Sequence, residues 1–104
     1  MNKYNKLVRD LIPDIIRQSG ANPVTRTIGD HDEYVAYLNA KLNEEVAEYQ
    51  ESKNLEELAD IQEVIYSLIK AQGLSLEDFE SLRLSKKKER GGFDCRMLLI
   101  EVKE

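Results

Sequence analysis

The sequence predicts a mainly α-helical protein, an antiparallel helical bundle with one minor two-stranded β element. Two long stretches, 30–50 and 54–72, carry apolar residues at the 3.6-residue spacing of amphipathic helices. A short turn at Ser52–Asn54 separates them, and helices joined by a tight turn pack as antiparallel neighbours. Two short stretches, Val24–Ile28 and Met97–Val102, instead have the composition of strands, and we expect them to pair.

The composition describes a single domain over residues 1–104. Apolar residues make up 41% of the chain and charged residues 34%, as in ordinary globular proteins. The net charge of −5 argues against a nucleic-acid-binding surface. One cysteine, Cys95, excludes an internal disulfide and suits a reducing compartment. With no predicted signal peptide or membrane span, these features predict a cytoplasmic protein without membrane partners.

The N-terminal part contains one short helix before the predicted strand. Pro13 suits the first turn of a helix, where its missing N–H costs nothing, so we expect a helix over Pro13–Gln18 that closes at Gly20. Asn22-Pro23 then marks a turn.

Capping residues define the two long helices. Asp30 is a plausible N-cap for the first, which we expect to run to about Gln50. Asn54 is the expected cap of the second, with Glu57 at the N3 position of a capping box. Gly73 ends this helix.

A third amphipathic helix is expected to open at Ser75 and to end at Gly91-Gly92. Its last turns are basic, and the cations there are Lys86, Lys87, Lys88 and Arg90. One interpretation is compensation of the helix dipole. The other is a phosphate grip, because lysine and arginine bind phosphate oxygens and the two glycines allow close approach of an anion.

Acidic residues repeat at helical spacing on both sides of the Ser52–Asn54 turn. Glu45 and Glu48 lie three residues apart, as do Glu57 and Asp60, so each pair shares a helix face. If the two helices pack together, four carboxylates converge and repel one another. A hard divalent cation such as Mg²⁺ relieves that repulsion, because it prefers oxygen ligands.

Two simpler interpretations compete with a metal site. Glu-rich helix faces are common in solvent, and Glu57 also fits a capping-box role. Against these, Glu57 falls inside the apolar stripe of its helix, where a carboxylate is costly unless it is neutralised. Lys41 falls on the same flank as Glu45 and Glu48.

Other reactive side chains give weaker patterns. His31 is the only histidine and Cys95 the only cysteine, so a zinc site is not expected and the role of each is open. Four tyrosines on helical faces are expected at the edge of the core, with stacking on a base as the alternative: Tyr34, Tyr37, Tyr49 and Tyr66.

The acidic residues form part of a longer pattern. The runs Glu44–Glu48 (EEVAE) and Glu57–Asp60 (ELAD) resemble the EExxE…ExxD signature of MazG-like nucleoside triphosphate pyrophosphohydrolases, of the all-α NTP pyrophosphatase superfamily. Two further segments resemble a small single-domain branch, namely Lys6–Pro13 (KLVRDLIP) and Lys86 with Arg90–Phe93 (RGGF). The resemblance covers most of residues 5–100, and the gap between the acidic motifs is shorter than in many members.

The resemblance implies Mg²⁺-dependent hydrolysis of a nucleoside triphosphate at the α–β phosphate bond, giving the monophosphate and pyrophosphate. It implies that Glu45, Glu48, Glu57 and Asp60 hold Mg²⁺, with Mn²⁺ as a substitute. Glu45 or Glu48 would orient or deprotonate the attacking water. The residues expected to bind the substrate or stabilise the departing pyrophosphate are Lys41, Lys86 and Arg90.

The resemblance also implies a homodimer or a higher homo-oligomer, and a role in nucleotide-pool house-cleaning. Two alternatives stay open at this point. One is a non-catalytic helical interaction or nucleotide-sensing module on the same scaffold. The other is a phosphoribosyl-ATP pyrophosphohydrolase, and the residues do not identify the base or sugar.

Overall fold

Four helices account for the regular structure of the protein in a computed structural model, which describes residues 4–104. They are α1 (Ile12–Gln18), α2 (His31–Ser52), α3 (Leu55–Ala71) and α4 (Leu76–Arg90). The prediction of a mainly α-helical protein is therefore confirmed. None of the helices in this part of the chain is both long enough and apolar enough to cross a membrane.

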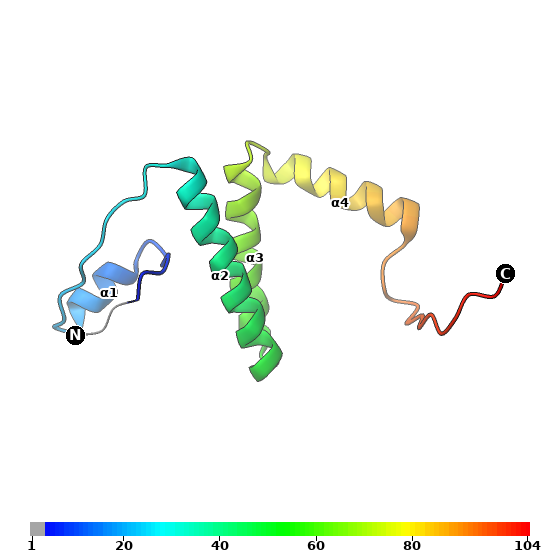
Figure 1. Cartoon of the computed structure of the whole chain (residues 1–104), viewed down its shortest axis with the longest axis horizontal. Helices are drawn as coiled ribbons and strands as arrows, with labels where there is room; N and C mark the ends of the chain where they lie inside the picture. The colour runs from blue at the N-terminus through cyan, green and yellow to red at the C-terminus, as the bar shows by residue number, and fades with distance from the viewer. Residues whose placement is uncertain (1–3) are drawn as a thin grey trace.

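Helices α2 and α3 form an antiparallel pair at the centre of the molecule (Figure 1). The chain reverses between them in two residues, with Lys53 in the left-handed conformation at φ 58°. The core between the helices is small, and its buried apolar side chains are Leu38 of α2 and Val64 and Ile69 of α3.

Side-chain caps define two of the helix starts as predicted. The Asp30 side chain accepts a hydrogen bond from the backbone N–H of Glu33 at 2.9 Å, and Ser75 accepts one from that of Asp78 at 3.0 Å. Asn54 is at the N-cap of α3, but its side chain makes no capping hydrogen bond. The capping bonds of Asp30 and Ser75 satisfy backbone N–H groups of the first turn that have no partner inside the helix.

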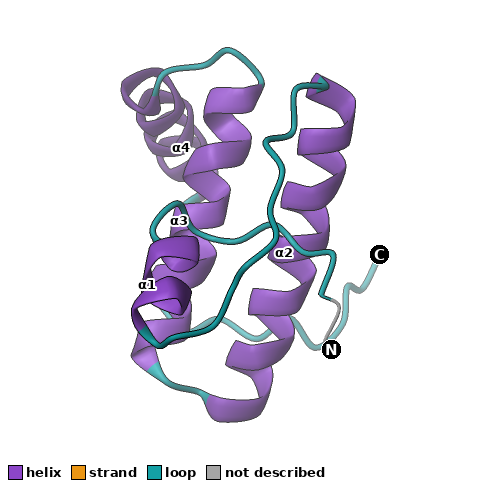
Figure 2. Ribbon diagram, turned by 90° about the vertical axis from the view of Figure 1, so that its left-hand side faces the viewer, coloured by secondary structure: helices purple, strands orange, loops and turns teal. Residues whose placement is uncertain are grey.

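The outer helices do not close around this pair. The short α1 and the segment before it lie beside the pair on one side, while α4 extends away on the other (Figures 1 and 2). The molecule measures 62 × 32 × 24 Å, with a radius of gyration of 18.3 Å. A compact domain of this length has a radius of gyration of about 13 Å. The chain is therefore much more open than a closed bundle.

The predicted two-stranded β element is wrong. Neither Val24–Ile28 nor Met97–Val102 forms a strand within residues 4–104. The two segments lie on opposite sides of the α2–α3 pair (Figure 1), so neither offers the other a hydrogen-bonding edge. Most of the apolar side chains in the two segments are open to solvent, with Val24 98% and Leu98 84% exposed. Strand propensity without a neighbouring strand does not make a sheet.

Candidate metal centre

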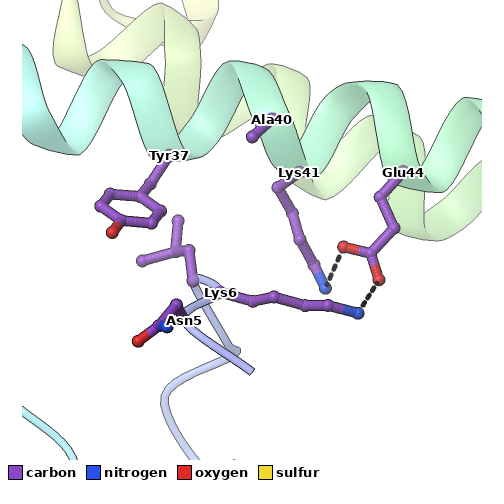
Figure 3. A pocket seen from close by; sticks show the side chains of 7 residues that line it. Asn5, Lys6, Tyr37, Ala40, Lys41 and Glu44 are labelled. Atoms are coloured by element: carbon purple, nitrogen blue, oxygen red, sulfur yellow. Dashed lines mark hydrogen bonds and ion pairs between the residues drawn. The ribbon is translucent and has the colours of Figure 1, made fainter. Parts of the chain in front are cut away.

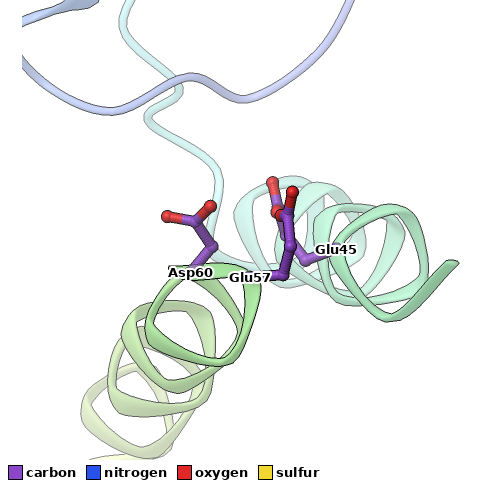
Figure 4. A group of neighbouring side chains, drawn as sticks. All are labelled: Glu45, Glu57 and Asp60. Carbon is purple, nitrogen blue, oxygen red and sulfur yellow. The ribbon is translucent and has the colours of Figure 1, made fainter. Parts of the chain in front are cut away.

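Three of the four predicted carboxylates meet between α2 and α3. Glu45 comes from α2, and Glu57 and Asp60 come from the first two turns of α3. Each offers a carboxylate oxygen, and these oxygens all lie within 4.8 Å of one another. Figure 4 shows the Glu45 and Glu57 carboxylates side by side, with that of Asp60 facing the same space. We call these three residues the acid cluster.

The chain reversal at Lys53 brings the cluster together. Because α2 and α3 are antiparallel and joined by a short turn, the end of α2 lies opposite the start of α3. Glu57 and Asp60 then project from one face of α3, since residues three apart on a helix share a face. The acid cluster is thus a direct product of i, i+3 spacing on two adjacent helices.

Glu57 is not engaged in a capping box. The backbone N–H of Asn54, which a capping-box glutamate would bind, donates instead to the Ser52 side chain at 3.1 Å. The carboxylate of Glu57 makes no hydrogen bond or ion pair within the described part of the chain and is half-buried. The capping-box interpretation of Glu57 is therefore wrong, and its carboxylate is available to a ligand.

The carboxylate of Glu45 is buried, and only one of its two oxygens has a charged partner. The residue is 7% exposed, and its Oε2 atom has no hydrogen-bond partner among residues 4–104. Its other oxygen, Oε1, lies 3.4 Å from the ammonium group of Lys41. Burial, and then the neighbouring charge of Glu48, raise the pKa of the Glu45 carboxyl, while Lys41 acts in the opposite direction. A buried acceptor left unpaired is costly, so this atom indicates a missing partner.

The chemistry of the cluster fits a hard divalent cation. All three residues offer carboxylate oxygens, which are the ligands that Mg²⁺ and Mn²⁺ accept and that soft metals do not favour. A cation would pair the orphaned Glu45 oxygen and cancel the repulsion among the carboxylates.

Glu48 occupies a different position from the other three acids. It is exposed and lies outside the acid cluster, although its charge acts on Glu45 from one turn further along α2. Its predicted metal-binding and catalytic roles stay predictions.

Basic residues of the N-terminal segment also reach the site, and periodicity in the sequence did not reveal them. Arg9 Nη2 lies 2.7 Å from Asp60 Oδ1, and Lys6 Nζ lies 2.9 Å from Glu44 Oε1. The hydrogen bond from Lys6 lowers the pKa of the Glu44 carboxyl. The Arg9–Asp60 pair is 55% and 39% exposed, so it is worth about 1 kcal/mol or less. The signal in the sequence that points to this segment is the resemblance of Lys6–Pro13 to the N-terminal segment of the small single-domain MazG-like branch.

Lys86 and Arg90 do not join the acid cluster of their own chain. Both lie in the last turns of α4, are exposed, and make no ion pair within residues 4–104. Helix α4 leaves the end of α3 that is remote from the cluster and extends outward (Figure 1). Lys41, in contrast, lies beside the cluster through its contact with Glu45.

The four tyrosines on helices are half-buried, which places them at the edge of the core. Tyr49 also faces the ammonium group of Lys53 at 5.6 Å from the ring centre. His31 and Cys95 are exposed, and neither belongs to the acid cluster.

Comparison with known proteins adds one partial relative. No known protein family matches the chain, and no solved structure matches it. A stretch of 43 residues is 65% identical to an uncharacterized protein of Mycolicibacterium smegmatis, covering 41% of this chain and 43% of that protein. The chain therefore spans less than half the length of this curated relative. The name of this relative states no activity, so the similarity assigns none to this chain.

Proposed function

We propose that this protein is a Mg²⁺-dependent nucleoside triphosphate pyrophosphohydrolase of the MazG-like type. The observation that carries the proposal is the buried, unpaired Oε2 atom of Glu45, which belongs to a cluster with Glu57 and Asp60. The cluster supports a divalent cation, and the resemblance of the acidic and basic motifs supplies the reaction class.

Electrostatics explain why the cation matters. Lys41 contacts one oxygen of Glu45 and Arg9 contacts one oxygen of Asp60, but Glu57 has no ion pair among the described residues. Negative charge is thus in excess at the point where burial makes it most costly. Mg²⁺ characteristically binds one or two carboxylates together with substrate phosphates, which matches a site half open to solvent.

The acidic residues have two different roles in the proposed reaction, metal binding and proton transfer. Glu45, Glu57 and Asp60 would hold the cation. A Mg²⁺ ion held there would supply charge neutralisation for the phosphates and a lower pKa for the attacking water. Glu48, which is exposed and lies one turn from Glu45 on α2, would accept the proton of the attacking water. The hydroxyl then forms the new bond to the α-phosphorus, and pyrophosphate leaves with the electrons of the α–β bond.

The open shape supports a homo-oligomer as the working form. The chain exposes 9458 Å², whereas a folded monomer of this length exposes about 6,000 Å². Apolar side chains contribute to the excess, among them Leu82 of α4 at 60% and Leu99 at 78% exposed. A second copy that covers these surfaces would also bring α4 close to another chain. Lys86 and Arg90 would then stabilise pyrophosphate at the partner's site, since their own site is out of reach.

An activity panel tests the proposal. Release of pyrophosphate is measured over canonical and damaged nucleoside triphosphates and phosphoribosyl-ATP, with Mg²⁺ or Mn²⁺. We expect turnover that is lost in Glu45→Gln and Asp60→Asn and kept in Glu63→Gln, an exposed acid of the same helix as Asp60. Mg²⁺ binding with no turnover on any substrate would support a nucleotide-sensing module instead. Preference for phosphoribosyl-ATP would assign the narrower activity.

A further inference from the structure

The N-terminal segment, residues 4–11, lies against the helix pair at the acid cluster. Two of its cations are held by acids of different helices, Lys6 by Glu44 of α2 and Arg9 by Asp60 of α3. Within residues 4–104, these are the ion pairs that connect the segment to the pair of long helices. Part of the positive charge at the site therefore comes from a segment that precedes α1, in addition to Lys41 of α2.

A hollow lies between this segment and α2. Its walls are formed by Asn5, Lys6, Leu7, Tyr37, Ala40, Lys41 and Glu44. Figure 3 shows the Lys6 and Lys41 side chains extending along it, with both ammonium groups directed at the carboxylate of Glu44. The Nζ atoms lie 2.9 Å and 3.6 Å from its two oxygens. Because Lys41 also contacts Glu45, two ammonium groups here face two carboxylates, and a cation bound by the acids would leave the ammonium groups free for an anion.

The hollow and the acid cluster are directly adjacent. Lys41 belongs to both, because its ammonium group lies 3.6 Å from Glu44 and 3.4 Å from Glu45. Arg9 contacts another acid of the cluster, Asp60, at 2.7 Å. A ligand that carries a metal ion and several negative oxygens would thus meet three carboxylates with cations next to them on two sides, Lys41 at Glu45 and Arg9 at Asp60.

We propose that Lys6 and Arg9, together with Lys41, form an anion subsite that binds the diphosphate portion of a metal-chelated nucleotide. This inference rests on the proposed function and extends it to residues outside the acidic and C-terminal motifs. Lysine supplies point charges to phosphate oxygens, and the arginine fork binds two of them at once. The chemistry fits a diphosphate better than a single carboxylate, because Lys6 and Lys41 line the hollow and Arg9 lies at the adjacent acid cluster, which together offer three cations to several phosphate oxygens.

The subsite works by exchange of ionic partners. Without ligand, Arg9 neutralises Asp60 and Lys6 neutralises Glu44. When a divalent cation occupies the acid cluster, it takes over the charge of Asp60 and frees the Arg9 guanidinium for phosphate. Arg9 therefore competes with the metal but cooperates with the metal–diphosphate complex. Replacing Arg9 should therefore leave the affinity for the metal alone equal or higher, and should lower the affinity for the metal–diphosphate complex.

Titration calorimetry of the full chain tests this, with Mg²⁺ alone and then with inorganic pyrophosphate in excess Mg²⁺. We expect Arg9→Gln to bind Mg²⁺ at least as tightly as the wild type and Mg²⁺–pyrophosphate roughly tenfold more weakly. Lys6→Gln should show the same loss for pyrophosphate. Arg17→Gln is the matched control, because Arg17 pairs with Asp14 within α1 and lies outside the hollow. Arg9→Lys should recover part of the lost affinity.

The outcomes separate this inference from the function on which it rests. No Mg²⁺ binding by the wild type would contradict the metal site and the subsite together. Mg²⁺ binding with the same pyrophosphate affinity in Arg9→Gln and Lys6→Gln as in the wild type would overturn the subsite alone. Circular dichroism checks that each variant keeps its helices. If Arg9→Gln does not fold, Lys6→Gln decides the question, since its exposed side chain bears no core contact.

Discussion

The ammonium group of Lys41 lies 3.4 Å from one oxygen of Glu45, while the other oxygen of that carboxylate is buried without a partner. Lys41 therefore compensates only one of the two carboxylate oxygens of Glu45. This arrangement resembles a binding site that is destabilised until its ligand arrives, as is common where function requires clustered charge.

Replacing Glu45 by glutamine should separate stability from binding. In chelator at neutral pH, we expect Glu45→Gln to melt at a higher temperature than the wild type, because it removes a buried charge that repels Glu48. Wild type should gain about 2.7 kcal/mol at Mg²⁺ concentrations near 100 times Kd, and the variant should gain none. Thermal unfolding with and without Mg²⁺ measures both effects. A variant less stable than the wild type in chelator would contradict this account of Glu45.

The raised pKa of Glu45 predicts a pH dependence of the metal-free protein. Because the folded-state pKa lies above the ordinary value of 4.5, the folded state retains the Glu45 proton more strongly than the unfolded chain. The stability contributed by this group is therefore complete below about pH 4.5 and is lost as pH rises through the folded-state pKa. Urea unfolding in chelator should show the wild type losing stability relative to Glu45→Gln between acidic and neutral pH. If the free energies of unfolding of the wild type and Glu45→Gln change in parallel with pH, the raised pKa of Glu45 would be contradicted.

Glu48→Gln should affect catalysis more than metal binding. Glu48 is exposed and outside the acid cluster, so the Mg²⁺-induced rise in melting temperature should be largely retained. If Glu48 accepts the proton of the attacking water, turnover should fall about 10²–10⁴-fold. Steady-state kinetics and thermal unfolding on the same preparation provide the two readouts. Loss of the Mg²⁺ effect would instead identify Glu48 as a metal ligand.

Leu82→Glu should dissociate the proposed oligomer. Leu82 is 60% exposed in a single chain, so most of its surface is open there, while the rest lines a hollow with Leu68 of α3 and Phe79 of α4. A charge on a surface that is covered in the assembly is costly, and the molar mass should fall toward that of one chain. Light scattering coupled to size exclusion measures this mass, with Ser81→Glu, at an adjacent exposed position, as the control. A wild-type monomer would exclude the oligomer outright.

The sequence predicted the local features of the site better than its tertiary surroundings. Helix caps and i, i+3 spacing depend on neighbouring residues, and these placed Glu45, Glu57 and Asp60 on facing helices. The predicted strands failed because pairing of Val24–Ile28 with Met97–Val102 requires two remote segments to meet, and the helix pair separates them. Arg9 was outside the periodic pattern for a similar reason, because its pairing with Asp60 spans 51 residues and depends on how the N-terminal segment lies.

The most direct test of the central claim is anomalous diffraction from crystals grown with Mn²⁺. We expect a manganese peak within coordination distance of carboxylate oxygens of Glu45, Glu57 and Asp60, and no peak at this position in Asp60→Asn crystals. A structure with Mn²⁺ present in which these three side chains bind no ion would contradict it.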